Sequence, residues 1–401
     1  MLQIQKPVVS HGANGSWKGV AQAAPVLRNR GALYTKKFAR YQNFWGTHVP
    51  ISTFVLKIFL VTPVLALLLT ACQPAPPPIV KLAGPTMGST YHISYVPGPA
   101  TGAPADVQGG VQAILDEIDQ AVSTYRPDSA LARFNAAPAG TCMDMPEAAL
   151  ALARHALALH QDSEGAFDVT LLPALEAWGF RHGGDEQPPP AQAPTPDELA
   201  RLRQRVGMQH LRVQGGQLCK DAPIRVEFNS TAAGYAVDRV SAWLIRQGAA
   251  SHLVEITGEM RASGLKPGGK PWRIAIEAPL ENAVQAQKIV ALRDQSLSTS
   301  GDYRNWREIG GQRQNHILDA RSLTPVRHRL ASVTVATESA QQADGLSTLL
   351  MALGPQAGHD YAVQRHIAAL FITREAEGFS VRATPAFDAA FPATAVTGET
   401  P

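Results

Sequence analysis

Apolar residues along this chain follow two spacings, one typical of helices and one typical of strands. Stretches with one apolar face predict helices over 106–123, 146–161, 197–206, 230–247 and 340–354. Alternating or β-branched stretches predict a first strand or hairpin over 80–95 and strands over 210–213, 217–220, 224–228, 251–261, 272–277, 289–292, 316–319, 330–335, 368–373 and 380–383. Clusters of strands between separated long helices indicate an α+β fold, with antiparallel or mixed sheets and long helices packed on them.

The predicted helix over 340–354 has an unusual polar face. Its leucines lie on one side, whereas Asp344 and Thr348, four residues apart, lie on the other. Asp344 is the only charged residue between Ser339 and Pro355, and a solvated face usually carries Lys, Glu or Arg. Two interpretations are open. The face is either an ordinary solvated one or the lining of a cleft, in which carboxylate and hydroxyl oxygens suit Mg²⁺ or Ca²⁺.

The composition indicates a large globular protein. The chain has 401 residues, of which 45% are hydrophobic, enough to bury a sizeable core in one large domain or two lobes. Its 36 basic and 33 acidic residues give a formal net charge of only +3. Part of the basic excess lies near the N-terminus, and no basic tract is interleaved with aromatic residues, so we expect no nucleic-acid partner.

An apolar run over 55–72 predicts export from the cytoplasm. It begins near a lysine and is short for a membrane span, so a secretory signal is favoured over a membrane anchor helix. Its last residues, Leu69-Thr70-Ala71-Cys72, resemble the bacterial lipobox, whose cysteine is lipidated after cleavage. Gln73 is not a residue that retains such proteins at the inner membrane. We therefore expect a periplasmic protein anchored to a membrane by lipid on Cys72.

These features divide the chain into five parts. Residues 1–54 are interpreted as a spurious extension from an upstream start codon, or as a disordered segment, and 55–72 as the lipoprotein signal. A Pro-rich tether is predicted over 73–84. The globular domain then occupies 85–384, and an Ala/Thr/Pro-rich tail over 385–401 is predicted to be disordered.

Two cysteines remain if Cys72 carries lipid. An oxidising compartment permits a disulfide between Cys142 and Cys219. The sequence does not show that these residues meet, and two buried free thiols are equally compatible with it.

A strand-to-helix turn near Ser230 is a candidate anion site. The predicted strand over 224–228 leads through Asn229-Ser230-Thr231 into a helix, whose first amides are free and lie at the positive end of its dipole. An ordinary capping serine is the alternative. The chain has no GxxxxGK[ST] sequence and no GxGxxG after a strand, which argues against a P-loop or a Rossmann fingerprint.

A series of motifs, in this order, resembles the FAD:protein FMN transferases, the ApbE family. The resemblance extends from about Thr86 to about Gly354. The matching segments are Thr86-Met87-Gly88-Ser89-Thr90, Ser123-Thr124-Tyr125-Arg126-Pro127-Asp128-Ser129, Arg133-Phe134-Asn135, Gly165-Ala166-Phe167-Asp168-Val169-Thr170, Trp178-Gly179-Phe180, Gly234-Tyr235-Ala236-Val237-Asp238, Pro271-Trp272-Arg273-Ile274, Thr299-Ser300-Gly301-Asp302-Tyr303, His316-Ile317-Leu318-Asp319 and Ala343-Asp344 with Thr348.

The resemblance implies a two-lobed catalytic domain that binds FAD and transfers its FMN half to a Thr or Ser hydroxyl of an acceptor redox protein, releasing AMP. It implies Mg²⁺ held by Ser230, Asp344 and Thr348, with Ser347 helping through water, and His316 as the group that takes the hydroxyl proton. A histidine base with a pKa near neutral suits that step. The positions that match cofactor-binding ones are Met87, Tyr125, Ala166, Phe167, Asp168, Glu227, Ala233 and Leu318.

The chain departs from the family pattern at several positions. Glu227 stands where Asp is usual, Ala233 where Lys or sometimes Glu is usual, and Thr257-Gly258 where a Gly-Gly pair is usual; Ala320 and Leu323 replace a usual Pro and Gly. Loss of the lysine removes a cation that favours diphosphate binding. Two other functions therefore stay open: a metal-dependent FAD hydrolase that forms FMN and AMP, and a flavin-binding or scavenging lipoprotein with weak catalysis.

Overall fold

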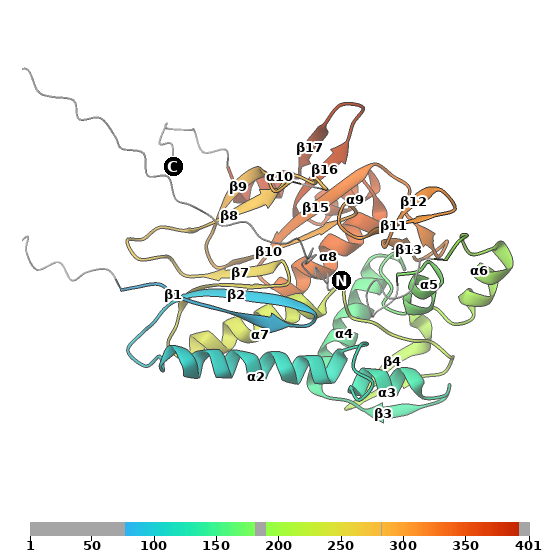
Figure 1. Ribbon diagram of the computed structural model, residues 1–401, viewed down its shortest axis with the longest axis horizontal. Helices are drawn as coiled ribbons and strands as arrows, with labels where there is room; N and C mark the ends of the chain where they lie inside the picture. Colours follow the sequence, from blue (N-terminus) through green and yellow to red (C-terminus); the bar gives the residue numbers. More distant parts are fainter. Residues whose placement is uncertain (1–76, 181–189, 282, 393–401) are drawn as a thin grey trace, which may run out of the picture. The chain divides into compact units, whose positions relative to one another are not determined.

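An eight-stranded antiparallel sheet organises the computed structural model, which describes residues 77–180, 190–281 and 283–392 (Figure 1). The strand order is β1-β2-β6-β7-β10-β15-β16-β17. The bounds are β1 Val80–Thr86, β2 Ser89–Val96, β6 Ser251–Ile256, β7 Glu259–Ser263, β10 Gln295–Gly301, β15 Leu330–Thr337, β16 Ala368–Arg374 and β17 Phe379–Ala383. The predicted signal over 55–72 and the extension before it lie outside the described residues.

Each face of this sheet has its own core, because successive side chains of a strand point to opposite faces. Val254 of β6 and Phe371 of β16 belong to the main core, whereas their neighbours Leu253 and Leu370 pack in a second core. The main core is covered by α2 (Pro104–Val122), α7 (Ala232–Arg246) and α8 (Ala340–Leu353). The second is covered by the β8–β9 hairpin (Trp272–Glu277 and Ala286–Leu292) and α10 (Pro385–Ala390).

The remaining elements form a smaller apolar cluster and extend the main core. Trp178 belongs to the smaller cluster, and its indole N–H donates a 2.8 Å hydrogen bond to the carbonyl of Leu323. The elements are α3 Ala130–Ala136, α4 Glu147–Asp162, α5 Leu172–Ala177, α6 Pro196–Arg203, α9 Ala357–Gln364, β3 Cys142–Asp144, β4 Leu211–Gln214, β5 Gln217–Lys220, β11 Trp306–Ile309, β12 Gln312–Asn315, β13 Leu318–Asp319 and β14 Thr324–Pro325. Every helix in the described ranges is too short or too polar to serve as a membrane span.

The predicted α+β class is confirmed, and so are the five predicted helices, with ends shifted by a few residues. Two predicted strands are wrong. The segment over 224–228 is extended but forms only an isolated bridge, from Arg225 to Leu171. The segment over 251–261 is a hairpin, β6–β7, because Thr257 (φ +56°) and Gly258 (φ +111°) adopt left-handed conformations that turn the chain.

The predicted boundaries of the domain also need correction at both ends. Strand β1 begins at Val80, inside the range predicted for the tether. Helix α10 begins at Pro385, inside the predicted disordered tail. Thr384 caps this helix by accepting a hydrogen bond from the Phe387 amide, and Phe387 is fully buried in the second core. One buried aromatic and a cap thus order a segment whose composition resembles a frayed terminus.

A disulfide joins Cys142 and Cys219, which lie opposite each other on β3 and β5. It closes a loop of 77 residues, and a cross-link of this kind stabilises a fold mainly by restricting the unfolded chain. We expect reduction with dithiothreitol to lower the free energy of unfolding by about 2–5 kcal/mol, measured by denaturant titration. The Cys142→Ser/Cys219→Ser variant serves as the control. A stability unchanged by reduction, or a variant still sensitive to it, would contradict this prediction.

Candidate functional site

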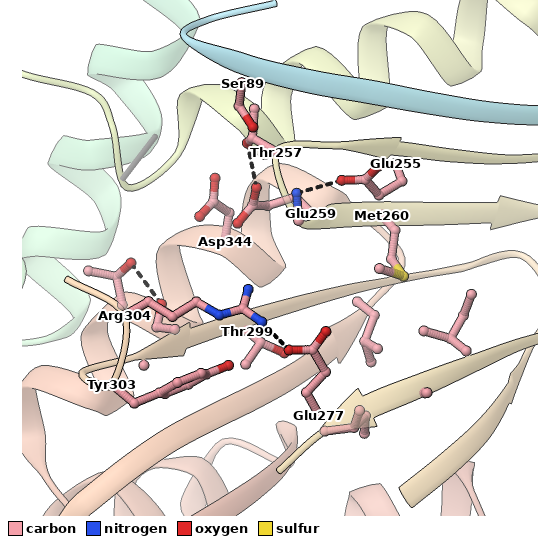
Figure 2. Close-up of a pocket in the computed structure, with 18 of the residues that line it drawn as sticks. Ser89, Glu255, Thr257, Glu259, Met260, Glu277, Thr299, Tyr303, Arg304 and Asp344 are labelled. Carbon is pink, nitrogen blue, oxygen red and sulfur yellow. Dashed lines mark hydrogen bonds and ion pairs between the residues drawn. The ribbon is translucent and has the colours of Figure 1, made fainter. Parts of the chain in front are cut away.

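Two cavities lie on either side of the polar face of α8. The larger has a volume of about 410 Å³ and is bordered by the β6–β7 turn, β8 and β10 (Figure 2). The smaller has a volume of about 150 Å³ and is bordered by α5, the segment before α7 and the segment around β13. Thr348 and Ser300 line both cavities. The two cavities therefore share a wall at the residue predicted to bind a metal ion.

The smaller cavity brings together most of the residues predicted from the sequence. Its predicted lining residues are Tyr125, Ala166, Phe167, Asp168, Glu227, Ser230, His316, Leu318 and Thr348. Apolar side chains that were not predicted, among them Leu171, Leu175 and Phe180, complete the wall. A largely apolar cavity with a few polar groups suits a flat heteroaromatic ring.

Tyr125 is an exposed lining residue of the smaller cavity and Glu227 a buried one. Tyr125 is 38% exposed, and burial of its hydroxyl, together with the charge of Glu227, raises its pKa to about 12. The phenol is therefore neutral at physiological pH. Glu227 is fixed by accepting a 3.0 Å hydrogen bond from the Asn229 amide.

Two predicted cofactor-binding residues line neither cavity. Met87 lies in the β1–β2 turn with φ +46°, partly buried against the main core. Ala233 is only 1% exposed, in the first turn of α7. The position at which the resemblance implies a long cation is thus filled here by a small buried side chain.

His316 has one bonded and one unbonded ring nitrogen. Its Nδ1 lies 2.7 Å from the carbonyl oxygen of Asn305, and because a carbonyl only accepts, Nδ1 carries the proton. Its Nε2 is buried without a hydrogen-bond partner among the described residues. Burial lowers the pKa of this imidazole to about 3, well below the near-neutral value expected from the sequence. His316 is therefore neutral at physiological pH, with its free lone pair on Nε2.

Asp344 is held between α7 and α8 and is only 3% exposed, so the solvated-face interpretation of this helix is wrong. Its Oδ2 accepts a 3.0 Å hydrogen bond from the amide of Gly234, in the first turn of α7. The helices approach so closely that a Cβ on Gly234 would lie 2.3 Å from the Ala340 carbonyl oxygen. Burial raises the pKa of Asp344 to about 6. A glycine at 234 thus allows the contact that orients this carboxylate.

Ser347 lines neither cavity and is bonded within the protein. Its hydroxyl is fully buried and donates to the carbonyl oxygen of Asp344 at 3.0 Å. It also lies 2.8 Å from the hydroxyl of Ser300, which is 3.3 Å from that of Thr348. These hydroxyls tie α8 to β10 and fix the side chain of Thr348.

The larger cavity is acidic, and apart from Asp344 its carboxylates were not predicted. Glu255, Glu259 and Glu277 line it with Asp344; Arg304 pairs with Glu277. Glu259 is 8% exposed, and its burial, together with the charge of Asp344, raises its pKa well above the usual range. The sequence offered one indication of a role for Glu259, which is that it directly follows the Thr257-Gly258 pair of the family-like motif.

The donor set fits a hard cation that keeps some of its water. Carboxylate and hydroxyl oxygens are the ligands that Mg²⁺ prefers, and it usually takes only one or two carboxylates from a protein. Accordingly, the described residues contain no cluster of three or more His, Cys, Asp or Glu side chains that would enclose a metal. Of the predicted ligands, Thr348 shares one cavity with Asp344 and the other with Ser230.

Comparisons with known proteins agree with these features. A sequence profile described as the ApbE family matches residues 87–371. A protein named FAD:protein FMN transferase from Vibrio cholerae is 39% identical over 322 residues, which cover 80% of this chain and 95% of the relative. Its counterpart from Salmonella typhimurium is 37% identical over 335 residues, which cover 80% and 94%.

Solved structures of flavin transferases named ApbE are also similar to this chain. The apo form of the Pseudomonas stutzeri flavinyl transferase ApbE has a TM-score of 0.74 and 46% identity, and the match covers 80% of this chain and 99% of that one. The Vibrio cholerae flavin transferase ApbE has a TM-score of 0.72 and 37% identity, with 79% and 100% covered. A Thermotoga maritima protein at 23% identity, with a TM-score of 0.69, shares the fold.

Proposed function

Because the chain belongs to the ApbE family, we propose that it is an FAD:protein FMN transferase, which moves FMN from FAD onto a Thr or Ser hydroxyl of an acceptor redox protein. The observation that carries this proposal is the smaller cavity. It combines an apolar slot for a ring, the free Nε2 of His316 and the side chain of Thr348, whose other side faces Asp344. Ring binding, proton acceptance and cation binding are thus available in adjoining spaces.

The proposed reaction is a phosphoryl transfer. The acceptor hydroxyl oxygen bonds to the FMN-side phosphorus of FAD, and the bond from that phosphorus to the bridging oxygen breaks, so that AMP leaves. The hydroxyl proton goes to Nε2 of His316, whose Nδ1–H bond to the Asn305 carbonyl fixes the ring in the required tautomer. A bound Mg²⁺ would neutralise charge on the diphosphate.

The protein's own contribution to that cation site is orientation. Asp344, Thr348 and an oxygen of Ser230 would hold the ion. The Gly234 amide fixes the Asp344 carboxylate, and the hydroxyl of Ser300 fixes that of Thr348. Ala233 brings no cation to this point, whereas the positive end of the α7 dipole favours a diphosphate here.

We also propose that the domain is lipid-anchored at Cys72 and works in the periplasm. The lipobox-like sequence supports this, and so does the Cys142–Cys219 disulfide, since stable disulfides are typical of oxidising compartments. We expect the full chain to fractionate with membranes and the Cys72→Ser variant to lose its lipid, as measured by labelled palmitate. Equal labelling of both proteins would contradict the anchor.

The transferase proposal is tested by incubating residues 73–401 with FAD, Mg²⁺ and an acceptor protein that the Vibrio cholerae flavin transferase modifies in the same assay. We expect flavin fluorescence that stays on the acceptor in a denaturing gel and is lost when the acceptor Thr is replaced by Ala. FMN and AMP formed without acceptor, and no labelled acceptor, would indicate the hydrolase instead. FAD that is bound but unchanged would indicate a binding protein.

A further inference from the structure

A second buried carboxylate faces Asp344 across the larger cavity. Glu259, the first residue of β7, is 8% exposed, and Asp344 is 3% exposed. Figure 2 shows the two side chains, from β7 and α8, directed into the same space. Neither makes an ion pair with a basic side chain of the described residues, whereas Glu277 of the same cavity pairs with Arg304.

Two unpaired buried carboxylates in one cavity are costly unless something compensates their charge. Part of their hydrogen-bonding capacity is also unused. Oδ2 of Asp344 accepts from the Gly234 amide, but Oδ1 accepts no hydrogen bond from the described part of the chain. An oxygen that is buried, charged and directed into a polar cavity is suited to a cation.

The β6–β7 turn holds Glu259 in this position. The hydroxyl of Thr257 donates a 2.9 Å hydrogen bond to Oε2 of Glu259. The next amide, of Gly258, donates to Oε1 of Glu255 at 2.7 Å and closes the turn. Thr257 has φ +56°, a conformation that β-branched residues rarely adopt. Thr257 therefore contributes a hydroxyl to the cavity.

We propose that Glu259 is a further oxygen ligand of the cation at Asp344 and Thr348, directly or through a water molecule, and that Thr257 positions its carboxylate. This inference rests on the cation site of the proposed function. It adds a ligand from the sheet to those from α7 and α8, so that the ion would link the β6–β7 turn to the helix pair. Thr257 acts through Glu259 and is a positioning residue.

The test is a titration of the FAD-free protein with Mn²⁺ alone at pH 8. The electron paramagnetic resonance signal of free Mn²⁺ measures how much of the ion is bound. Glu259→Gln keeps the shape of the side chain and the bond from Thr257. We expect it to weaken Mn²⁺ binding by about tenfold or more, and Thr257→Gly to weaken it severalfold. Thr257→Ser, which keeps a hydroxyl, should restore binding to within about twofold of the wild type.

Glu277→Gln is the matched control, because it makes the same change in the same cavity at a carboxylate already paired with Arg304. We expect it to bind Mn²⁺ like the wild type. Thermal melts without cation check folding, and Glu259→Gln should melt no lower than the wild type, because it replaces a buried carboxyl group that has no basic partner among the described residues. Glu259→Gln and Glu277→Gln proteins with equal Mn²⁺ affinity would overturn the inference.

The measurement is independent of transfer activity. If the wild type and Glu259→Gln bind Mn²⁺ with the same affinity, the role of Glu259 is contradicted. The transferase proposal is then unaffected. A wild-type protein that binds no Mn²⁺ overturns the inference together with the cation site.

Discussion

Replacing Asp344 by Ala is expected to lower Mg²⁺-dependent FMN transfer by at least about a hundredfold. The substitution removes the carboxylate that faces the larger cavity beside Thr348, and with it the charge that would hold the cation. It leaves the leucine face of α8 in the main core untouched. The turnover number at saturating FAD, measured over a series of Mg²⁺ concentrations, checks this result.

Two further variants separate chemistry from folding in this experiment. Asp344→Asn keeps an acceptor for the Gly234 amide but not the charge, so it should lose activity while retaining stability. Asp344→Ala leaves that amide unsatisfied, at a cost of about 1–3 kcal/mol. Asp360→Ala, on an exposed carboxylate of α9, should leave both properties unchanged. Normal turnover by the Asn variant would show that the carboxylate does not serve the reaction.

Replacing His316 by Ala is expected to lower the rate of transfer by about 10²–10⁴-fold while FAD still binds. The reason is that Nε2 is the free proton acceptor in the smaller cavity, whereas the apolar wall of that cavity is unchanged. Single-turnover transfer and fluorescence titration with FAD measure the two quantities. His366→Ala, at an exposed histidine, is the control. An equal loss of FAD affinity and rate would indicate a binding residue instead.

The pH dependence of the wild type tests the same residue. Because burial lowers the pKa of His316 to about 3, its imidazole should stay neutral between pH 5 and 8, as seen by ¹⁵N NMR. An unfolded histidine has a pKa of about 6.5. Between these values the unfolded chain binds a proton that the folded chain does not, so this residue makes stability fall as the pH drops from about 6.5 towards 3. An imidazolium signal at pH 6 in the folded protein would contradict this.

The parts of the fold that could be predicted are those with a local signal. Helices α2, α4, α7 and α8 each carry an apolar stripe, which a single stretch of sequence reveals. The β4–β5 hairpin is marked by its Gly-Gly turn. The absence of other charges around Asp344 also indicated correctly that this helix face is buried, because a solvated face usually carries several charges.

The parts that could not be predicted depend on contacts between distant residues. Strand β10 is central to the sheet, but the side chains that it directs towards α8 are serines, and the hydroxyls of Ser298 and Ser300 bond to Ser347 instead of forming an apolar pattern. The turn at Thr257 could not be predicted from the sequence, because threonine favours strands. A role for Glu259 could not be predicted, because only the folded sheet places it in the same cavity as Asp344.

The central claim is that the two cavities sharing Thr348 form one site for FAD and a cation. Its most direct test is a crystal structure of the His316→Ala protein with FAD and Mn²⁺. We predict FAD density from the smaller cavity past Thr348, and an anomalous Mn²⁺ peak within about 2.0–2.6 Å of an Asp344 oxygen. FAD bound away from the smaller cavity, or a Mn²⁺ peak away from Asp344, would contradict the assignment of this site.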